Sequence, residues 1–134
     1  MSTIKVDTVQ STGGGAVTLT NQHAAKAWVN FDGTASGAAA RGSFNNSSMT
    51  DNGTGDYTIT LSNAVDSTNN IVANGLCTDD TSTNNHVSHL SLNRTSGGSP
   101  FTTTTVTILC NFDGQTTTLN DMDFTTVVIH GDLA

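Results

Sequence analysis

Apolar and polar residues alternate along much of this chain. In YTITLS, residues 57–62, every second residue beginning with Tyr57 is apolar, and the residues between are Thr or Ser. Side chains of a strand point alternately to its two faces, so this pattern predicts a strand with one buried face. Turn-forming clusters separate such segments every ten or so residues, which favours a sandwich or barrel. Further strands are predicted for AKAWVNF, IVANGLC, HVSHLSLNR, TTTVTILCNF and DFTTVVIHG.

The segment TDNGTGDYT, which precedes the strand at Tyr57, could be a turn or a metal-binding loop. Asn52-Gly53 followed by Gly55 supplies the residues with positive φ that a tight hairpin needs. A calcium loop of the EF-hand kind needs a closing glutamate, and all 11 acidic residues of this chain are aspartate. We therefore predict a hairpin turn that leads into the strand at Tyr57.

Residues 1–24 differ from the remainder and are predicted to form an N-terminal β arm. Two short alternating segments flank the glycine run at 13–15. A lone hairpin is only marginally stable in water, so this arm needs another surface to lie against. Its four apolar anchors and the only tryptophan of the chain form the predicted subunit interface: Ile4, Val6, Val17, Leu19 and Trp28.

Composition supports an all-β chain and excludes several functions. Ser, Thr, Asn and Gly make up about half of the residues, and the apolar fraction is 34%. The core is therefore thin or shared between subunits. A net charge of −7 with four basic residues argues against a nucleic-acid partner. No apolar run approaches the length of a membrane span, so we expect no membrane insertion. Because the N-terminus lacks the blocks of a signal peptide, we expect synthesis in a cytoplasm.

Candidate chemistry is sparse. His86 and His89 lie three apart in a predicted strand and would point to opposite faces, so they cannot chelate one ion within a subunit. A ring with one histidine per subunit is left open, as is a role for His130. Cys77 and Cys110 are predicted to be unlinked thiols. Neither a G-x-S-x-G motif nor a phosphate-binding loop is present. We expect no enzyme activity, no catalytic residue, no metal and no cofactor.

Residues 25–65, AKAWVNFDGT through SFNNSSMTDNGTGDYTITLSNAV, are similar to tail-fibre and other virion structural proteins of tailed bacteriophages, notably phages of marine cyanobacteria. The opening STIKVDTVQSTGGGAVTLT and the end VVIHGDLA resemble the same proteins, whereas residues 75–105 do not. The stretch SGAAAR departs from the more apolar family pattern. The resemblance implies a β-rich homotrimer on the virion, a receptor met by variable loops, and no catalytic residue.

Together these observations predict an antiparallel β-sandwich of jelly-roll type at residues 25–134, preceded by the arm at 1–24 and assembled as a homotrimer. The expected function is that of a phage virion structural protein, a short tail fibre or tail-tip component that binds a host surface glycan or protein. A capsid decoration protein or head fibre is the alternative, and a polysaccharide depolymerase is the third hypothesis. Other virion proteins are expected partners. The long polar loops TDDTSTNN and TSGGSP suit receptor contact, and the candidate residues are Asp79, Asp80, Asn84, Asn85 and His86.

Overall fold

A computed structural model describes residues 12–13, 25–78, 88–92, 99–112 and 119–132. Within these ranges the chain is all-β, with a single short 3-10 helix at Thr68–Asn70 and no α-helix. None of the described residues form a helix long and apolar enough to cross a membrane. The strands are β1 (Ala25–Phe31), β2 (Ala40–Phe44), β3 (Asn46–Gly53), β4 (Asp56–Leu61), β5 (Val72–Thr78), β6 (Ser88–Leu92), β7 (Thr105–Phe112) and β8 (Phe124–His130).

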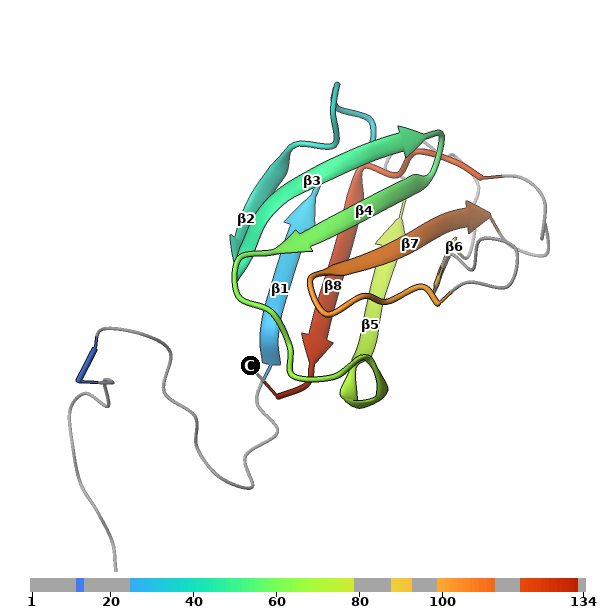
Figure 1. The fold of residues 1–134 in the computed structure, drawn as a ribbon. Coiled ribbons are helices and arrows are strands. Elements are labelled where there is room, and N and C mark those ends of the chain that lie inside the picture. Colours follow the sequence, from blue (N-terminus) through green and yellow to red (C-terminus); the bar gives the residue numbers. More distant parts are fainter. Residues whose placement is uncertain (1–11, 14–24, 79–87, 93–98, 113–118, 133–134) are drawn as a thin grey trace, which may run out of the picture.

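The strands form two four-stranded sheets that pack face to face (Figure 1). The first sheet has the order β2-β1-β8-β5, and the second has the order β3-β4-β7-β6. Every pair of neighbouring strands is antiparallel. The predicted all-β, antiparallel architecture is therefore confirmed.

The core lies between the two sheets and follows the alternation seen in the sequence. On β4 the side chains of Tyr57, Ile59 and Leu61 are buried, as predicted. The rings of Phe31 on β1 and Tyr57 on β4 meet edge to face with centroids 4.9 Å apart, which joins the sheets. Each fully buried aliphatic or aromatic side chain contributes roughly 1.5–3 kcal/mol. Other core side chains come from both sheets: Ala27, Val29, Val106, Ile108, Val127 and Ile129.

The segment TDNGTGDYT is a hairpin turn between β3 and β4, as the sequence predicted. Gly53 pairs with Asp56, and Gly53 and Gly55 have φ values of 132° and 65°. The Gly53 N–H donates to Asp51 Oδ1 over 2.9 Å, which closes the turn. Asp51 thus serves the backbone of the hairpin. The strand β2, in the stretch where the family pattern breaks down, was not predicted.

The chain enters and leaves the described domain side by side. Ala25 at the start of β1 pairs with His130 at the end of β8. Residues 1–24 therefore join the domain at the end of the first sheet where the inner strand β1 begins and β8 finishes. Several predicted site residues lie outside the described residues, namely Ile4, Val6, Val17, Leu19, Asp79, Asp80, Asn84, Asn85 and His86.

Candidate functional site

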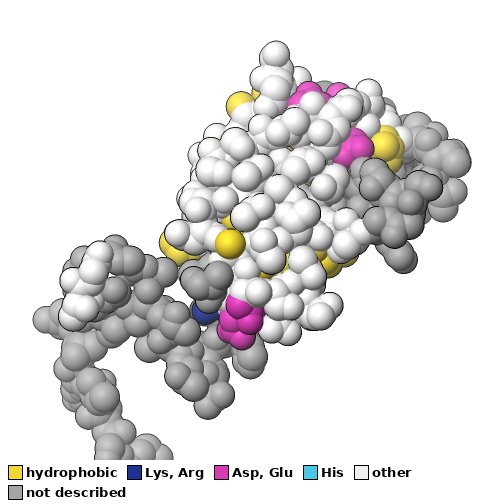
Figure 2. All heavy atoms as spheres, in the orientation of Figure 1, with side chains coloured by type: hydrophobic (Ala, Val, Ile, Leu, Met, Phe, Trp, Pro, Cys, Tyr) yellow, Lys and Arg dark blue, Asp and Glu magenta, His cyan; other side chains and the backbone are white. Residues whose placement is uncertain are grey.

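The outer face of the second sheet, here called the hydroxyl face, is covered by small polar side chains. Residues directly opposite one another in an antiparallel pair share a face, and the register aligns two rows, Ser48–Thr60–Thr105 and Thr50–Thr58–Thr107. The Thr58 and Thr107 hydroxyls lie 3.4 Å apart, and Asn52 Nδ2 donates to Thr58 Oγ1 over 2.9 Å. In Figure 2 the visible side of the sandwich is mostly neither hydrophobic nor charged, and acidic groups gather toward its ends.

The outer face of the first sheet, here called the apolar face, has the opposite character. Trp28 on β1 lies opposite Phe44 on β2 and Val128 on β8. Trp28, Phe44 and Leu76 remain 41%, 51% and 76% exposed. Single exposed apolar residues are common on protein surfaces, whereas a contiguous group marks an interaction site. All five large exposed hydrophobic residues among the described ones lie on the strands of this sheet: Trp28, Phe44, Val72, Leu76 and Phe124.

Trp28 is part of this surface and not of the core. A methyl group added at Gly42 would lie 3.5 Å from atoms of the indole ring, so the ring lies over β2 at a position without a side chain. The sequence analysis placed Trp28 in a core or an interface, and its 41% exposure excludes the core of the described domain. Its part in a subunit interface stays a prediction.

Arg41 lies at one end of the apolar face, beside Phe124. Its guanidinium lies 4.4 Å from the centroid of the Phe124 ring, and Nη2 contacts Asp32 Oδ2 over 2.7 Å. Nη1 also donates to the backbone oxygen of Asp123. The hydrogen bond from the Thr34 hydroxyl and, to a smaller degree, the Arg41 charge hold the pKa of Asp32 below its ordinary value. The exposed ion pair contributes little stability, but Arg41 fixes the orientation of Phe124.

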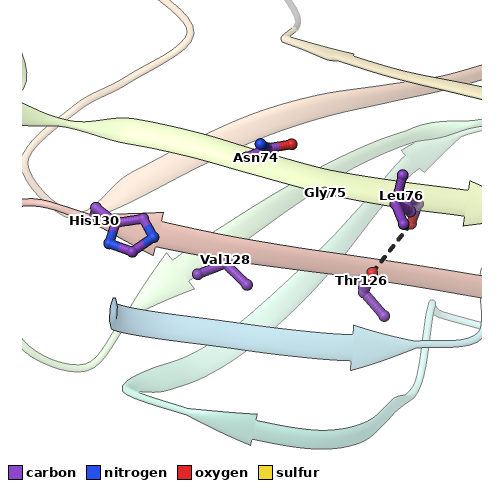
Figure 3. A pocket seen from close by; sticks show the side chains of 6 residues that line it. All are labelled: Asn74, Gly75, Leu76, Thr126, Val128 and His130. Carbon is purple, nitrogen blue, oxygen red and sulfur yellow. Dashed lines mark hydrogen bonds between the residues drawn. The ribbon is translucent and has the colours of Figure 1, made fainter. Parts of the chain in front are cut away.

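A hollow of about 450 Å³ lies on the same face between β5 and β8 (Figure 3). Leu76 and Val128 supply its apolar walls, and polar groups come from Asn74, Thr126 and His130. The Thr126 hydroxyl donates to the backbone oxygen of Leu76 over 3.4 Å. An apolar hollow with a few polar groups can receive an aromatic side chain or a small ligand.

Gly75 sets the spacing of the strands beneath this hollow. A Cβ atom at this position would lie 2.0 Å from the backbone oxygen of Thr126, closer than any real contact. Only glycine therefore allows β5 to approach β8 so closely at this point. Sequence reasoning did not single out this residue.

Asp121 is exposed at one end of the core and accepts hydrogen bonds from the buried Tyr57 and from the turn. The Tyr57 hydroxyl lies 2.6 Å from Asp121 Oδ1 and 3.2 Å from the Gly33 backbone oxygen. The Gly55 N–H donates to the same Asp121 oxygen over 2.7 Å. Burial, and then Asp121, raise the pKa of Tyr57 far above its ordinary value, so the phenol stays protonated. The cluster therefore anchors the β3–β4 turn to the segment before β8.

The two cysteines are free thiols, in agreement with the prediction, and both are buried. They come from opposite sheets, Cys77 from β5 and Cys110 from β7. A hydrogen bond between them lowers the pKa of Cys77 and, together with burial, raises that of Cys110 far above its ordinary value. Cys110 Sγ also lies 3.8 Å from Thr125 Oγ1. That these two thiols are neighbours could not be predicted from the sequence.

Within the described ranges no cluster of three or more His, Cys or Asp side chains could hold a metal ion. His89 is exposed on β6 in the second sheet, whereas His130 lies on β8 in the first. The structure therefore does not bring these two histidines together.

The chain matches no family model, no curated protein and no solved structure.

Proposed function

We propose that this chain is a structural protein of a phage virion that works as a homotrimer, in a short tail fibre or tail tip that binds a host surface ligand. The observation that carries the proposal is the grouping of the exposed large hydrophobic residues on one sheet. Such a face favours permanent cover by protein, while the hydroxyl face suits contact with water. The resemblance of residues 25–65 to virion proteins supplies the biological setting.

The fold we propose is a jelly roll. The chain passes from the first sheet to the second after β2 and returns after β4. It changes sheet again after β5 and after β7. The first strand pairs with the last, β1 with β8, as in a jelly roll, whereas the pairing of β4 with β7 is not one of the ribbon pairings of that fold. Jelly rolls are frequent in virion proteins, which supports the proposal.

The homotrimer follows from the thin core and the uncovered apolar face. Trp28, which belongs to the predicted interface, lies on that face. We place the arm at residues 1–24 between subunits or against a neighbouring virion protein. Light scattering should then give three times the chain mass of 13.8 kDa.

Locating the protein on virions tests the biological role. Antibodies raised against the purified chain should label the tail or tail tip in electron micrographs of phage particles. Label on the capsid would favour a decoration protein or head fibre instead, and the absence of label from intact particles would refute a virion role. Binding of the fluorescent protein to host cells, with a variant carrying alanine at 79, 80, 84 and 85 as comparison, tests ligand contact by the predicted loop.

A further inference from the structure

We infer that copies of this chain associate head to tail through the apolar face, so that the Phe44 and Trp28 side of one copy packs against the hollow between β5 and β8 of the next. This inference rests on the self-association in the proposed function and is independent of the virion role. Two observations carry it: the described outward positions of β1, β8 and β5 hold no acidic residue, and exposed aromatic rings on one side of the face could enter an open apolar hollow on the other.

Electrostatics favour a second copy as the occupant. The chain carries a net charge of −7, so two copies repel wherever their acidic surfaces meet. No described outward position of β1, β8 or β5 carries an acidic residue. At the end of the face, Asp32 is already paired with Arg41. The apolar face is therefore a surface on which two copies can meet without juxtaposing like charges.

One side of the face carries exposed aromatic rings, and the other carries an open apolar hollow. On the β2 and β1 side, the aromatic rings of Phe44 and Trp28 are about half exposed. On the β5 and β8 side lies the hollow of about 450 Å³, with Leu76 and Val128 in its walls (Figure 3). Buried tryptophans need an acceptor for the indole N–H, and Asn74 at the hollow offers a side-chain amide oxygen. Aromatic side chains that fill apolar pockets dominate the energetics of interfaces.

The apolar face is large enough to form part of a subunit interface. Four strands about 4.8 Å apart, with about 3.3 Å per residue over seven residues, give a face of roughly 440 Å². A stable interface buries about 800 Å² on each partner, so the face supplies roughly half of this area. The remainder must come from flanking segments.

When two copies associate head to tail, the hollow of one copy and the aromatic side of the other remain unused. Such heterologous contacts generate closed rings when the rotation between copies closes. A trimer in which each copy uses both sides leaves none of them exposed. The head-to-tail contact thus accounts for a closed ring, such as the proposed homotrimer, in preference to a twofold dimer.

The first experiment compares the same substitution on the two outer faces. Leu76→Asn places a polar amide in the wall of the hollow, and Leu109→Asn places it on the hydroxyl face, opposite Asp56 and Ser91. We expect Leu76→Asn to weaken assembly about 100-fold, as removal of an interface hot spot does, and Leu109→Asn to leave the mass of the wild-type assembly unchanged. Circular dichroism checks that both variants fold. Equal effects of the two substitutions would overturn the inference.

Trp28 provides a second readout that needs no variant, because it is the only tryptophan in the chain. Acrylamide should quench its fluorescence several-fold more weakly in the assembly than in diluted monomer. An assembly in which Trp28 remains open to acrylamide would overturn this contact and leave the homotrimer standing. If the wild-type protein were monomeric at about 100 μM, both the proposed contact and the homotrimer would be refuted. Labelling of virions tests the biological role separately.

A mixing experiment tests the head-to-tail arrangement. Phe44→Asp disables one side of the face and Leu76→Asp disables the other, so each variant alone should be monomeric. An equimolar mixture should form pairs of twice the 13.8 kDa chain mass, because each pair contains one intact contact and cannot extend. This arrangement would be refuted if the mixture stayed monomeric at about ten times the concentration at which the wild-type protein assembles.

Discussion

Replacing Tyr57 by phenylalanine should lower the free energy of unfolding substantially, although it removes only one oxygen atom. The Tyr57 side chain is fully buried, and its hydroxyl contacts Asp121 Oδ1 over 2.6 Å and the Gly33 backbone oxygen over 3.2 Å. Phenylalanine fits the same space and keeps the ring contact with Phe31. The substitution therefore isolates the hydroxyl group from the packing of the ring.

The magnitude follows from the partners that lose a donor. A hydrogen bond to a charged acceptor contributes about 1.5–3 kcal/mol, and a buried carbonyl left without a donor adds to the loss. We expect Tyr57→Phe to lower the free energy of unfolding by about 2 kcal/mol. Asp121→Ala should cost at least as much, because the Gly55 N–H loses the same acceptor. The double variant should cost less than the sum, because both single changes break one shared bond.

Urea unfolding at one fixed protein concentration measures these values, since self-association adds to apparent stability. Thr60→Val is the matched control, because it removes a hydroxyl from an outward position of the same strand, β4. Its cost should stay near zero. A loss below about 0.5 kcal/mol for Tyr57→Phe, or strict additivity with Asp121→Ala, would refute the account of this cluster.

Three further outcomes follow from the described contacts. Gly75→Ala should push β5 away from β8 and lower the free energy of unfolding by more than about 2 kcal/mol, measured by urea denaturation; a neutral effect would contradict the close approach. Alkylation of unreduced, denatured protein should label both Cys77 and Cys110, and a mass two units low without labels would instead reveal a disulfide. Because the pKa of Asp32 is lowered on folding, its stabilising contribution is complete above its unfolded pKa and is lost as the pH falls through the folded pKa. Carboxyl resonances followed by NMR should show that Thr34→Val raises this pKa toward its ordinary value.

The sequence predicted the strands best where one face is apolar and the other polar. In β4 the alternation from Tyr57 to Leu61 marked both the strand and its buried side. The turn at Gly53 and Gly55 was equally clear, because positive φ values leave few alternatives to glycine. The strand β2 was missed because Ala40–Phe44 contains a glycine and a single large apolar residue, and its pairing with β1 decides its conformation.

The apolar face escaped prediction for a related reason. In β8, Phe124 and Val128 face outward while Val127 and Ile129 face the core, so the strand contains a run of three apolar residues, VVI. Such a run indicates a strand covered on both faces, and this signal was present in the sequence. That Leu76 on β5 belongs to the same surface could not be known, because the neighbours of a strand are set by sheet order.

The adjacent ends of β1 and β8 determine how this domain responds to mechanical load. Hydrogen bonds between antiparallel strands run perpendicular to the strands. A force that pulled Ala25 away from His130 would load the pair at one end and break its bonds one after another, as in unzipping. A force that enters through residues 1–24 and leaves through the far loops instead runs along β1 and loads its bonds to β2 and β8 together. The domain is therefore built to resist tension when it is tethered through one end of the chain, and to yield when it is stretched between both.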